Sequence, residues 1–343
     1  MTARLRRRWL RRHGAGILAA GLVAIAGCER AGGRAQKPPP VPVEPAPALP
    51  PWTGPLCSTD VAPRPERDPS PMCWVPAATF MMGTPAEHAG PYDFLPRKVR
   101  ISRGFYMDQY EVTVEQFVRF ANEVGNQCAG PGPDRRDEGD LCFHPSSVYV
   151  TPRSGGGHSP VRGRERTPAE PYRRGALAYC AWADKVLPTE AQWALAAFHD
   201  PTTGKDRLYP WGDDVRPRIT NCFDGEGGCQ DGFQHETPVG TFADDRSATG
   251  LIEMGGNLDE WVQDCFVRAP PCGEPCVDPI VTTGCEERDC ARDQTCFLSR
   301  GGRTAYVAID AARRHATFLD SGAGFRCAVI SDVARRAHPH RPR

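Results

Sequence analysis

The spacing of apolar residues predicts two helices that begin with the same local motif. Over residues 114–124 the apolar side chains recur every three or four positions, which is typical of one face of a helix. Thr113 stands before this stretch and Gln116 follows three residues later, the pattern of a capping box. Thr189 and Gln192 repeat the pattern before another apolar stretch. We therefore expect helices that begin directly after Thr113 and Thr189.

A third helix is predicted over residues 172–185, where Leu177, Cys180 and Ala183 recur at intervals of three. Short apolar runs indicate four strands, at residues 79–82, 99–101, 105–110 and 325–330. The segments between these elements show no regular pattern. The chain of 343 residues contains 35 Gly and 35 Pro, which together favour many loops and few long helices. The pattern predicts a loop-rich protein with a few short helices and strands.

The first 27 residues are typical of an export signal. They carry six arginines and no acidic residue, followed by the apolar stretch GAGILAAGLVAIAG, which is short for a membrane span. Small residues then precede Cys28 directly, which resembles the lipidation signal of bacterial lipoproteins. We expect Cys28 to be lipidated, with an ordinary secretion signal as the alternative. RRRWLRR is also similar to a twin-arginine export motif, a weaker signal.

The signal peptide is followed by a Pro-rich tether over residues 28–71, expected to be extended and of polyproline character. A basic tail is expected at residues 332–343. The formal charge of the whole chain is zero, but residues 28–343 carry 36 Lys and Arg against 42 Asp and Glu. The exported part is thus mildly acidic, which argues against a nucleic-acid partner.

Fourteen cysteines remain beside Cys28, an even number that predicts a disulfide framework in an exported protein. Several are neighbours in sequence, but the sequence alone does not fix the pairing. Zinc is the alternative, although no tight C-x2-C spacing or histidine occurs in residues 272–290. Six of the cysteines fall in a Cys-rich insertion over residues 265–296: Cys265, Cys272, Cys276, Cys285, Cys290 and Cys296.

Several segments, in order, resemble the formylglycine-generating enzyme or sulfatase-modifying factor family. These are FMMG, EVTVEQFVRF, AYCAWA, LPTEAQWALAA, YPWG, TPVGTF, TGLIEMGGNLDEW, RGG and GFRC. The resemblance covers residues 72–331. It implies one α+β domain of the formylglycine-generating-enzyme type, similar to C-type lectins, with little regular secondary structure. It also implies a disulfide between Cys180 and Cys327.

The resemblance further implies two calcium sites. Asn221 and Asp231 match the side-chain ligands of the first site, and Glu253 and Glu260 match those of the second. Glu253 stands where the family usually has Asn or Asp, and its side chain is one methylene longer than that of Asp. The alternative is a pair of acidic loops capped by backbone amides. The remaining ligands would be backbone carbonyls, those of Cys222 and Phe233 in the first site and of Gly256 and Leu258 in the second.

The family's oxidase needs two cysteines between RGG and GFR, whose thiolates bind copper(I), because soft sulfur ligands select this ion. Residues 302–324 contain no cysteine and no methionine, and one histidine, His315. The sequence therefore predicts that copper does not bind here and that no catalytic residue of this chemistry is present. His315 with Asp310 and Asp320 could form an acid–base set, with surface charges as the alternative.

The expected function is a non-catalytic, calcium-stabilised binding or scaffold module, lipid-anchored to the periplasmic or cell-surface face of a bacterial envelope. Its partners would be the membrane and a peptide, glycan or envelope protein. The alternative is a formylglycine-generating or related oxidase that acts on a protein cysteine through a rearranged site. Trp211, Trp261 and Tyr306 are candidates for a binding groove, with burial in the core as the alternative.

Overall fold

A computed structural model gives the fold of the chain. It describes residues 57, 67–68, 70–89, 93–126, 128, 142, 149–214, 216, 218–221, 231–283, 297–302, 314–317 and 323–330. The signal peptide with Cys28, most of the tether and the basic tail lie outside the described residues. No helix among the described residues is both long and apolar enough to cross a bilayer.

Three helices stand where the apolar spacing predicts them: α1 (Val114–Val124), α2 (Arg173–Trp182) and α3 (Glu190–Phe198). Both capping boxes are confirmed. The Gln116 amide donates to Thr113 Oγ1 at 3.4 Å, and the Thr113 amide donates to Gln116 Oε1 at 2.8 Å. Thr189 and Gln192 exchange the corresponding bonds at 3.2 and 2.9 Å. These bonds satisfy amide groups that the first turn of each helix leaves without a helical partner.

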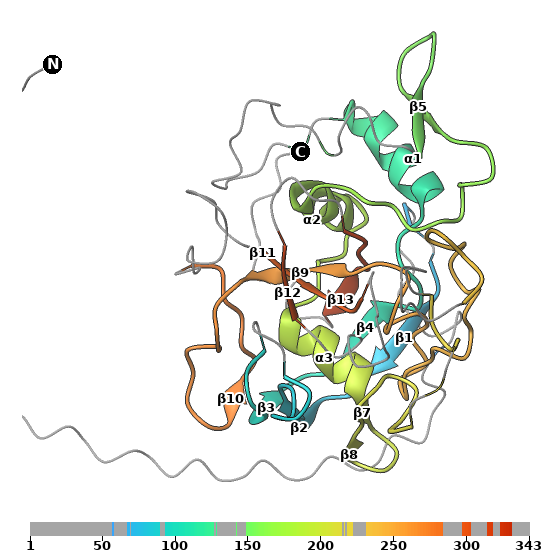
Figure 1. Ribbon diagram of the computed structural model, residues 1–343. Coiled ribbons are helices and arrows are strands. Elements are labelled where there is room, and N and C mark those ends of the chain that lie inside the picture. The colour runs from blue at the N-terminus through green and yellow to red at the C-terminus, as the bar shows by residue number, and fades with distance from the viewer. Residues whose placement is uncertain are drawn as a thin grey trace, which may run out of the picture. The chain divides into compact units, whose positions relative to one another are not determined.

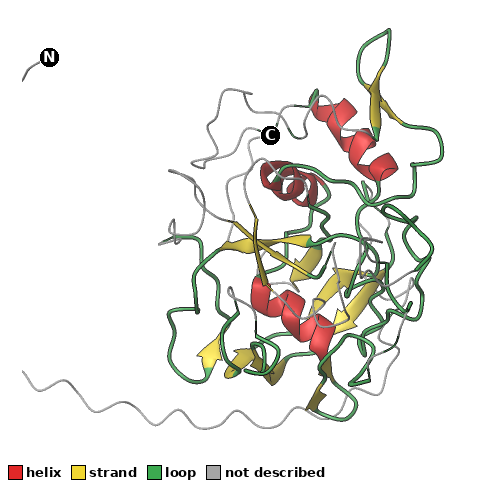
Figure 2. Cartoon of the chain, viewed as in Figure 1, coloured by secondary structure: helices red, strands yellow, loops and turns green. Residues whose placement is uncertain are grey.

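The strands form three small sheets and two hairpins, connected by long irregular segments (Figures 1 and 2). The order in the first sheet is β1 (Met72–Val75), β4 (Phe105–Asp108), β13 (Ala328–Ile330), and in the second β10 (Cys276–Val277), β3 (Arg97–Ile101), β2 (Ala78–Met82). The third contains β12 (Arg314–Thr317), β11 (Phe297–Arg300), β9 (Glu260–Cys265). The hairpins are β5 (Val150–Pro152) with β6 (His158–Pro160), and β7 (His199–Asp200) with β8 (Lys205–Asp206). All four predicted strands are present, with boundaries shifted by one to three residues.

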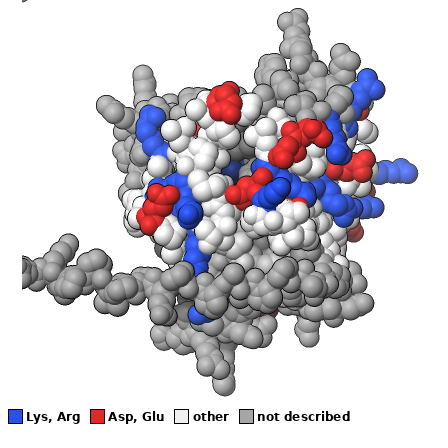
Figure 3. All heavy atoms as spheres, turned by 90° about the horizontal axis from the view of Figure 1, so that it is seen from below, with Lys and Arg blue, Asp and Glu red and all other residues white. Residues whose placement is uncertain are grey.

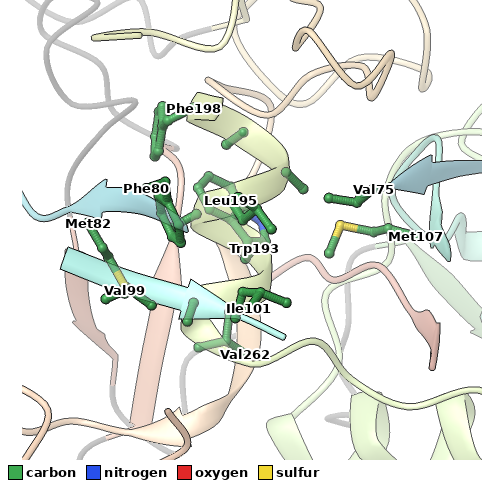
Figure 4. Close-up of a cluster of buried hydrophobic side chains, with 14 of the residues drawn as sticks. Val75, Phe80, Met82, Val99, Ile101, Met107, Trp193, Leu195, Phe198 and Val262 are labelled. Carbon is green, nitrogen blue, oxygen red and sulfur yellow. The ribbon is translucent and has the colours of Figure 1, made fainter. Parts of the chain in front are cut away.

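Helix α3 lies at the centre of one apolar core. All nine of its residues are buried, and Trp193 and Leu195 face side chains of β2, β3 and β9 (Figure 4). Val99, Ile101 and Val262 from these strands are at most 3 % exposed. Because the helix is covered on all sides, its apolar residues do not keep to one face, unlike those of a helix at the surface.

A second core joins α1 and α2 to the end of the chain. Phe117, Phe120 and Tyr179 contact one another with ring centroids 5.4 to 5.9 Å apart, and Phe325 lies edge-on against Phe117 and Tyr179. Ring pairs at these separations add stability beyond the area that they bury. These aromatic contacts pack α1 and α2 against the segment that precedes β13.

Disulfides hold these cores together. The bond between Cys180 and Cys327, the pair that the resemblance implies, joins α2 to the residue before β13. Three further bonds close short loops: Cys57–Cys73, Cys128–Cys142 and Cys272–Cys276. Cys265 is also disulfide-bonded. Disulfides in this number are typical of proteins outside the reducing cytoplasm.

Candidate functional site

Arg326, from the GFRC segment, is the centre of a buried polar site. Its side chain is fully buried, and its guanidinium donates to both carboxylate oxygens of Glu260 at 2.6 to 2.9 Å. The remaining donors reach the backbone carbonyls of Asp108, Gln109 and Ile252 at 3.0 to 3.2 Å. Trp193 Nε1 donates to Glu260 from α3 at 2.8 Å. One arginine thus connects β4, the 252–260 loop and β9.

Glu111 lies in the same site, although the sequence analysis did not select it. Its Oε2 accepts a hydrogen bond from Asn257 Nδ2 at 2.9 Å, and Asn257 Oδ1 accepts one from the Thr237 amide at 3.0 Å. Glu111 Oε1 and Thr237 Oγ1 are buried and lack any hydrogen-bond partner. A carboxylate oxygen in this state costs free energy unless a proton or a cation satisfies it.

Negative charge is in excess here. Four carboxyl groups here are at most 2 % exposed, and each interacts electrostatically with the guanidinium of Arg326: Glu111, Glu253, Glu260 and Asp245. Burial, together with the charges of Glu260 and Glu253, raises the pKa of Glu111 well above its ordinary value. Burial also raises the pKa of Asp245 to about 7 and raises that of Glu253. The site favours an added positive charge because it is buried and acidic.

The four residues of the second predicted calcium site lie in and beside one loop. Glu253, at a positive φ of 58°, accepts hydrogen bonds from the amides of Gly240 and Phe242 at 2.8 and 2.9 Å. Both oxygens of Glu260 are occupied by Arg326 and Trp193, as described above. Gly256 and Leu258 lie between the two glutamates, and both are buried. Glu253 thus has an amide donor at each carboxylate oxygen, and its role as a calcium ligand stays a prediction.

The side chains of the first predicted site lie together. Asn221 Nδ2 donates to Asp231 Oδ2 at 2.9 Å, and Asp231 Oδ1 accepts from the Phe233 amide at 2.7 Å. A cation between the two residues would require the amide of Asn221 to turn its oxygen toward Asp231. Cys222, the other predicted carbonyl ligand, lies outside the described residues. The two predicted sites touch, since the Asn257 amide donates to the Asn221 carbonyl at 3.2 Å.

The donor set fits a hard cation in its chemistry. Carboxylate, amide and backbone carbonyl oxygens are the ligands that Ca²⁺ prefers, and the charge excess and the unsatisfied oxygen of Glu111 lie beside them. Among the described residues no group of three or more His, Cys, Asp or Glu side chains is arranged to hold a metal. Calcium is thus supported by charge and donor class, and its coordination stays a prediction.

Thiols do not offer a comparable copper site in the described part of the chain. All nine cysteines there are in disulfides. Most of the segment between RGG and GFR lies outside the described residues, and its lack of cysteine is a property of the sequence.

Two of the aromatic residues suggested for a groove belong to the core. Trp261 is fully buried and donates from Nε1 to the Pro171 carbonyl at 3.1 Å. Trp211 is 7 % exposed and stacks on Tyr209, with ring centroids 5.2 Å apart. The groove interpretation is wrong for both, because their apolar rings are already covered. Tyr306, Asp310 and Asp320 lie outside the described residues, and His315 is in β12.

Residues 58–330 match the family model of the sulfatase-modifying factor enzyme 1-like domain. The chain belongs to this family. The match includes all the residues of the buried polar site.

Curated relatives include proteins named as formylglycine-generating enzymes and one named as inactive. The chain is 29 % identical to the formylglycine-generating enzyme of Bos taurus over 299 residues, 76 % of this chain and 75 % of that protein. It is also 29 % identical to the enzyme of Thermomonospora curvata, over 75 % of this chain and 93 % of that one. It is 28 % identical to the inactive C-alpha-formylglycine-generating enzyme 2 of Mus musculus, over 59 % and 71 % of the two chains.

Solved structures share the fold. PvdO from Pseudomonas aeruginosa matches with a TM-score of 0.55 at 22 % identity, over 77 % of this chain and 95 % of that chain. The Treponema denticola variable protein 1 matches with a TM-score of 0.50 at 17 % identity, over 76 % and 95 %. At these identities the likeness concerns the fold alone, and function must be argued from the site.

Proposed function

We propose that this chain is a non-catalytic binding or scaffold module, stabilised by calcium and held to the bacterial envelope by a lipid on Cys28. One observation carries the proposal: residues 302–324, where the family's oxidase needs two copper-binding cysteines, contain none. The disulfide bonding of the nine described cysteines supports it, since it leaves no thiol in that part of the chain to take their place. The partner would be a peptide, a glycan or an envelope protein.

A copper-binding assay tests the loss of the oxidase. The exported protein is titrated with copper(I) and then given oxygen and a Cys-x-Pro-x-Arg peptide, with the Thermomonospora curvata enzyme as a positive control. We expect neither tight binding through two thiolates nor oxygen consumption above the level without protein. Copper binding with peptide oxidation would overturn the proposal in favour of an oxidase that uses a rearranged site.

Counting thiols gives an independent test. The protein is unfolded in guanidinium without reductant and treated with an alkylating reagent, and its mass is measured by mass spectrometry. If the fourteen cysteines after Cys28 form seven disulfides, no alkylation occurs. Two alkylated cysteines in the same molecule would contradict the proposal, because they would supply the pair that copper needs. The same mass spectrum shows whether Cys28 carries a lipid.

A further inference from the structure

A short loop of the Cys-rich insertion carries the disulfide between Cys272 and Cys276. The residues between the two cysteines, Gly273, Glu274 and Pro275, are all exposed. Cys272 itself is half-buried, whereas Cys276 is 1 % exposed. One cysteine of the pair is thus open to solvent and its partner is covered, so an incoming thiol would meet Cys272 first.

The guanidinium of Arg97, from β3, lies at this loop. Its Nη1 donates to the Pro270 carbonyl at 2.7 Å, and its Nη2 donates to the Cys272 carbonyl at 2.6 Å. Cys272 Sγ lies 3.6 Å from the same Pro270 oxygen, so one carbonyl connects the cation to the sulfur. The described acceptors of Arg97 are neutral carbonyls, and Glu274, the acid of the loop, is exposed to water, which screens its charge. The guanidinium therefore favours a thiolate at Cys272 once the bond opens.

β10 fixes the other end of the loop. Cys276 pairs with Val99 of β3, and the Asp278 amide donates to the Arg100 carbonyl at 2.8 Å. The carboxylate of Asp278 accepts from the Ser102 amide at 2.8 Å. These contacts do not involve the sulfurs, so we expect the two cysteines to stay close in the reduced protein and the bond to form again.

Opening this bond should cost the domain little stability. A disulfide restrains the unfolded chain less when the loop that it closes is shorter. The sequence separation is 4 here, against 14, 16 and 147 for the other three bonds whose two partners are both described. The fold therefore depends less on this bond than on the one between Cys180 and Cys327.

The loop lies where a soluble reductant can reach it. β2, β3 and β10 are at the lower edge of the molecule in Figure 1. Figure 3 views the molecule from below and shows Lys, Arg, Asp and Glu side chains mixed over that face. The face as a whole thus favours neither charge on a reductant, and reactivity is decided at the sulfurs.

We propose that Cys272 and Cys276 form a redox-active disulfide, which exchanges with a dithiol through Cys272. A thiolate of the dithiol attacks Cys272 Sγ, and Cys276 leaves and takes up a proton. The second thiolate of the dithiol then attacks the dithiol's own sulfur in the mixed disulfide and releases Cys272 as a thiolate beside Arg97. The protein gains two electrons, and the dithiol becomes a disulfide.

This chemistry goes beyond the proposed scaffold role and needs neither calcium nor copper. In the isolated, oxidised protein the pair carries no free thiol. The thiol count expected above is therefore unchanged, and the two proposals can fail separately.

Equilibration of the protein with mixtures of reduced and oxidised dithiothreitol tests the pair. Thiols are trapped with acid and alkylated, and peptide mass spectrometry assigns each cysteine. We expect Cys272–Cys276 to be half reduced at a ratio of reduced to oxidised reagent roughly tenfold lower than Cys57–Cys73 requires. Cys57–Cys73 is the matched control because it also joins a half-buried cysteine to a buried one. A ratio equal to that of the control, or higher, would overturn the proposal.

Single variants test which sulfur is attacked. Cys276→Ser leaves Cys272 as a thiol, which should form a mixed disulfide with oxidised glutathione. In Cys272→Ser the buried Cys276 should react roughly tenfold more slowly. Near-UV circular dichroism identifies the variants that keep the native fold. Equal rates, or faster reaction of Cys276, would reject exchange through Cys272.

Arg97→Gln tests the guanidinium as a positioning residue. In the Cys276→Ser background it should move the pH profile of Cys272 alkylation by iodoacetamide to higher pH, because the thiolate loses its cation. Lys98→Gln, at the next and exposed residue of β3, removes the same charge and should leave the profile unchanged. An equal shift in both variants, or none in either, would overturn the role given to Arg97.

Discussion

Two buried polar sites among the described residues differ in how their charges are balanced. In one, Lys185 is fully buried and contacts Asp68 at 3.0 Å and Asp108 at 2.6 Å. Tyr179 donates to Asp68 at 3.0 Å, and the Cys327 amide donates to Asp108 at 2.9 Å. The other site has four carboxyl groups around Arg326 and an unsatisfied oxygen on Glu111.

The difference shows how two buried sites in one fold can have different roles. Every carboxylate in the Lys185 site has protein donors, so this site can be complete as it stands. In the Arg326 site, burial raises the pKa of Glu111, Asp245 and Glu253, and neighbouring carboxylates raise the pKa of Glu111 and Asp245 further. A buried group of this kind is stable only with a proton or a cation. We therefore expect the first site to respond to substitution and the second to respond to metal as well.

The largest effect should come from removing Lys185. Lys185→Met leaves Asp68 and Asp108 buried without their cation, and loss of one partner from a buried ion pair costs about 3–5 kcal/mol. Urea denaturation of the two proteins measures the difference in the free energy of unfolding. Lys205→Met, at an exposed lysine in β8, is the control and should change little. A loss below 1 kcal/mol for Lys185→Met would mean that the site is not a balanced ion pair.

The pH dependence of stability should report on Asp108. Burial raises its pKa to about 6, against the opposing effect of Lys185, whereas the unfolded chain has the ordinary value near 4. Between these values the folded state binds more protons, so the contribution of Asp108 to stability falls as pH rises. Relative to Asp108→Asn, the parent should lose up to about 1.4 kcal/mol per pH unit in this window.

Urea denaturation at half-unit steps from pH 4 to 6.5 measures this slope. Asp244→Asn, at an exposed aspartate, is the control and should keep the slope of the parent. If Asp108→Asn also keeps that slope, the pKa of Asp108 is not raised in the folded protein.

Calcium removal should affect the Arg326 site. An ion that binds only the folded state stabilises it by about 2.7 kcal/mol at one hundred times its dissociation constant. EDTA should therefore lower the melting temperature by several degrees, and excess Ca²⁺ should restore it. Glu111→Gln should reduce this response, because it removes one charge and an oxygen that lacks a partner. Glu115→Gln, an exposed glutamate in the first turn of α1, should not.

An unchanged melting temperature in EDTA would argue against calcium at both predicted sites. A response that Glu111→Gln leaves intact would place the ion at Asn221 and Asp231 instead. The EDTA response thus tests whether calcium binds at all, and the Glu111→Gln variant tests where it binds.

The sequence was informative where local rules decide the structure. Thr113 and Thr189 predicted the starts of α1 and α3, since a capping box depends on residues three positions apart. β9 and β11 were not predicted, because almost every residue in them is buried and the alternation of apolar and polar positions is lost. Glu111 was missed for a related reason: its partner Asn257 lies 146 residues away.

The disulfide between Cys57 and Cys73 has a mechanical consequence. A pull on the chain before Cys57 would pass through the sulfurs into β1, which pairs with β4 and through it with β13. The 15 residues between the two cysteines would add no length under load. In single-molecule extension, reduction of this bond should release about 50 Å of chain before the domain unfolds. While the disulfide is intact, force applied to the chain before Cys57 would therefore reach β1 directly, whatever the length of that chain.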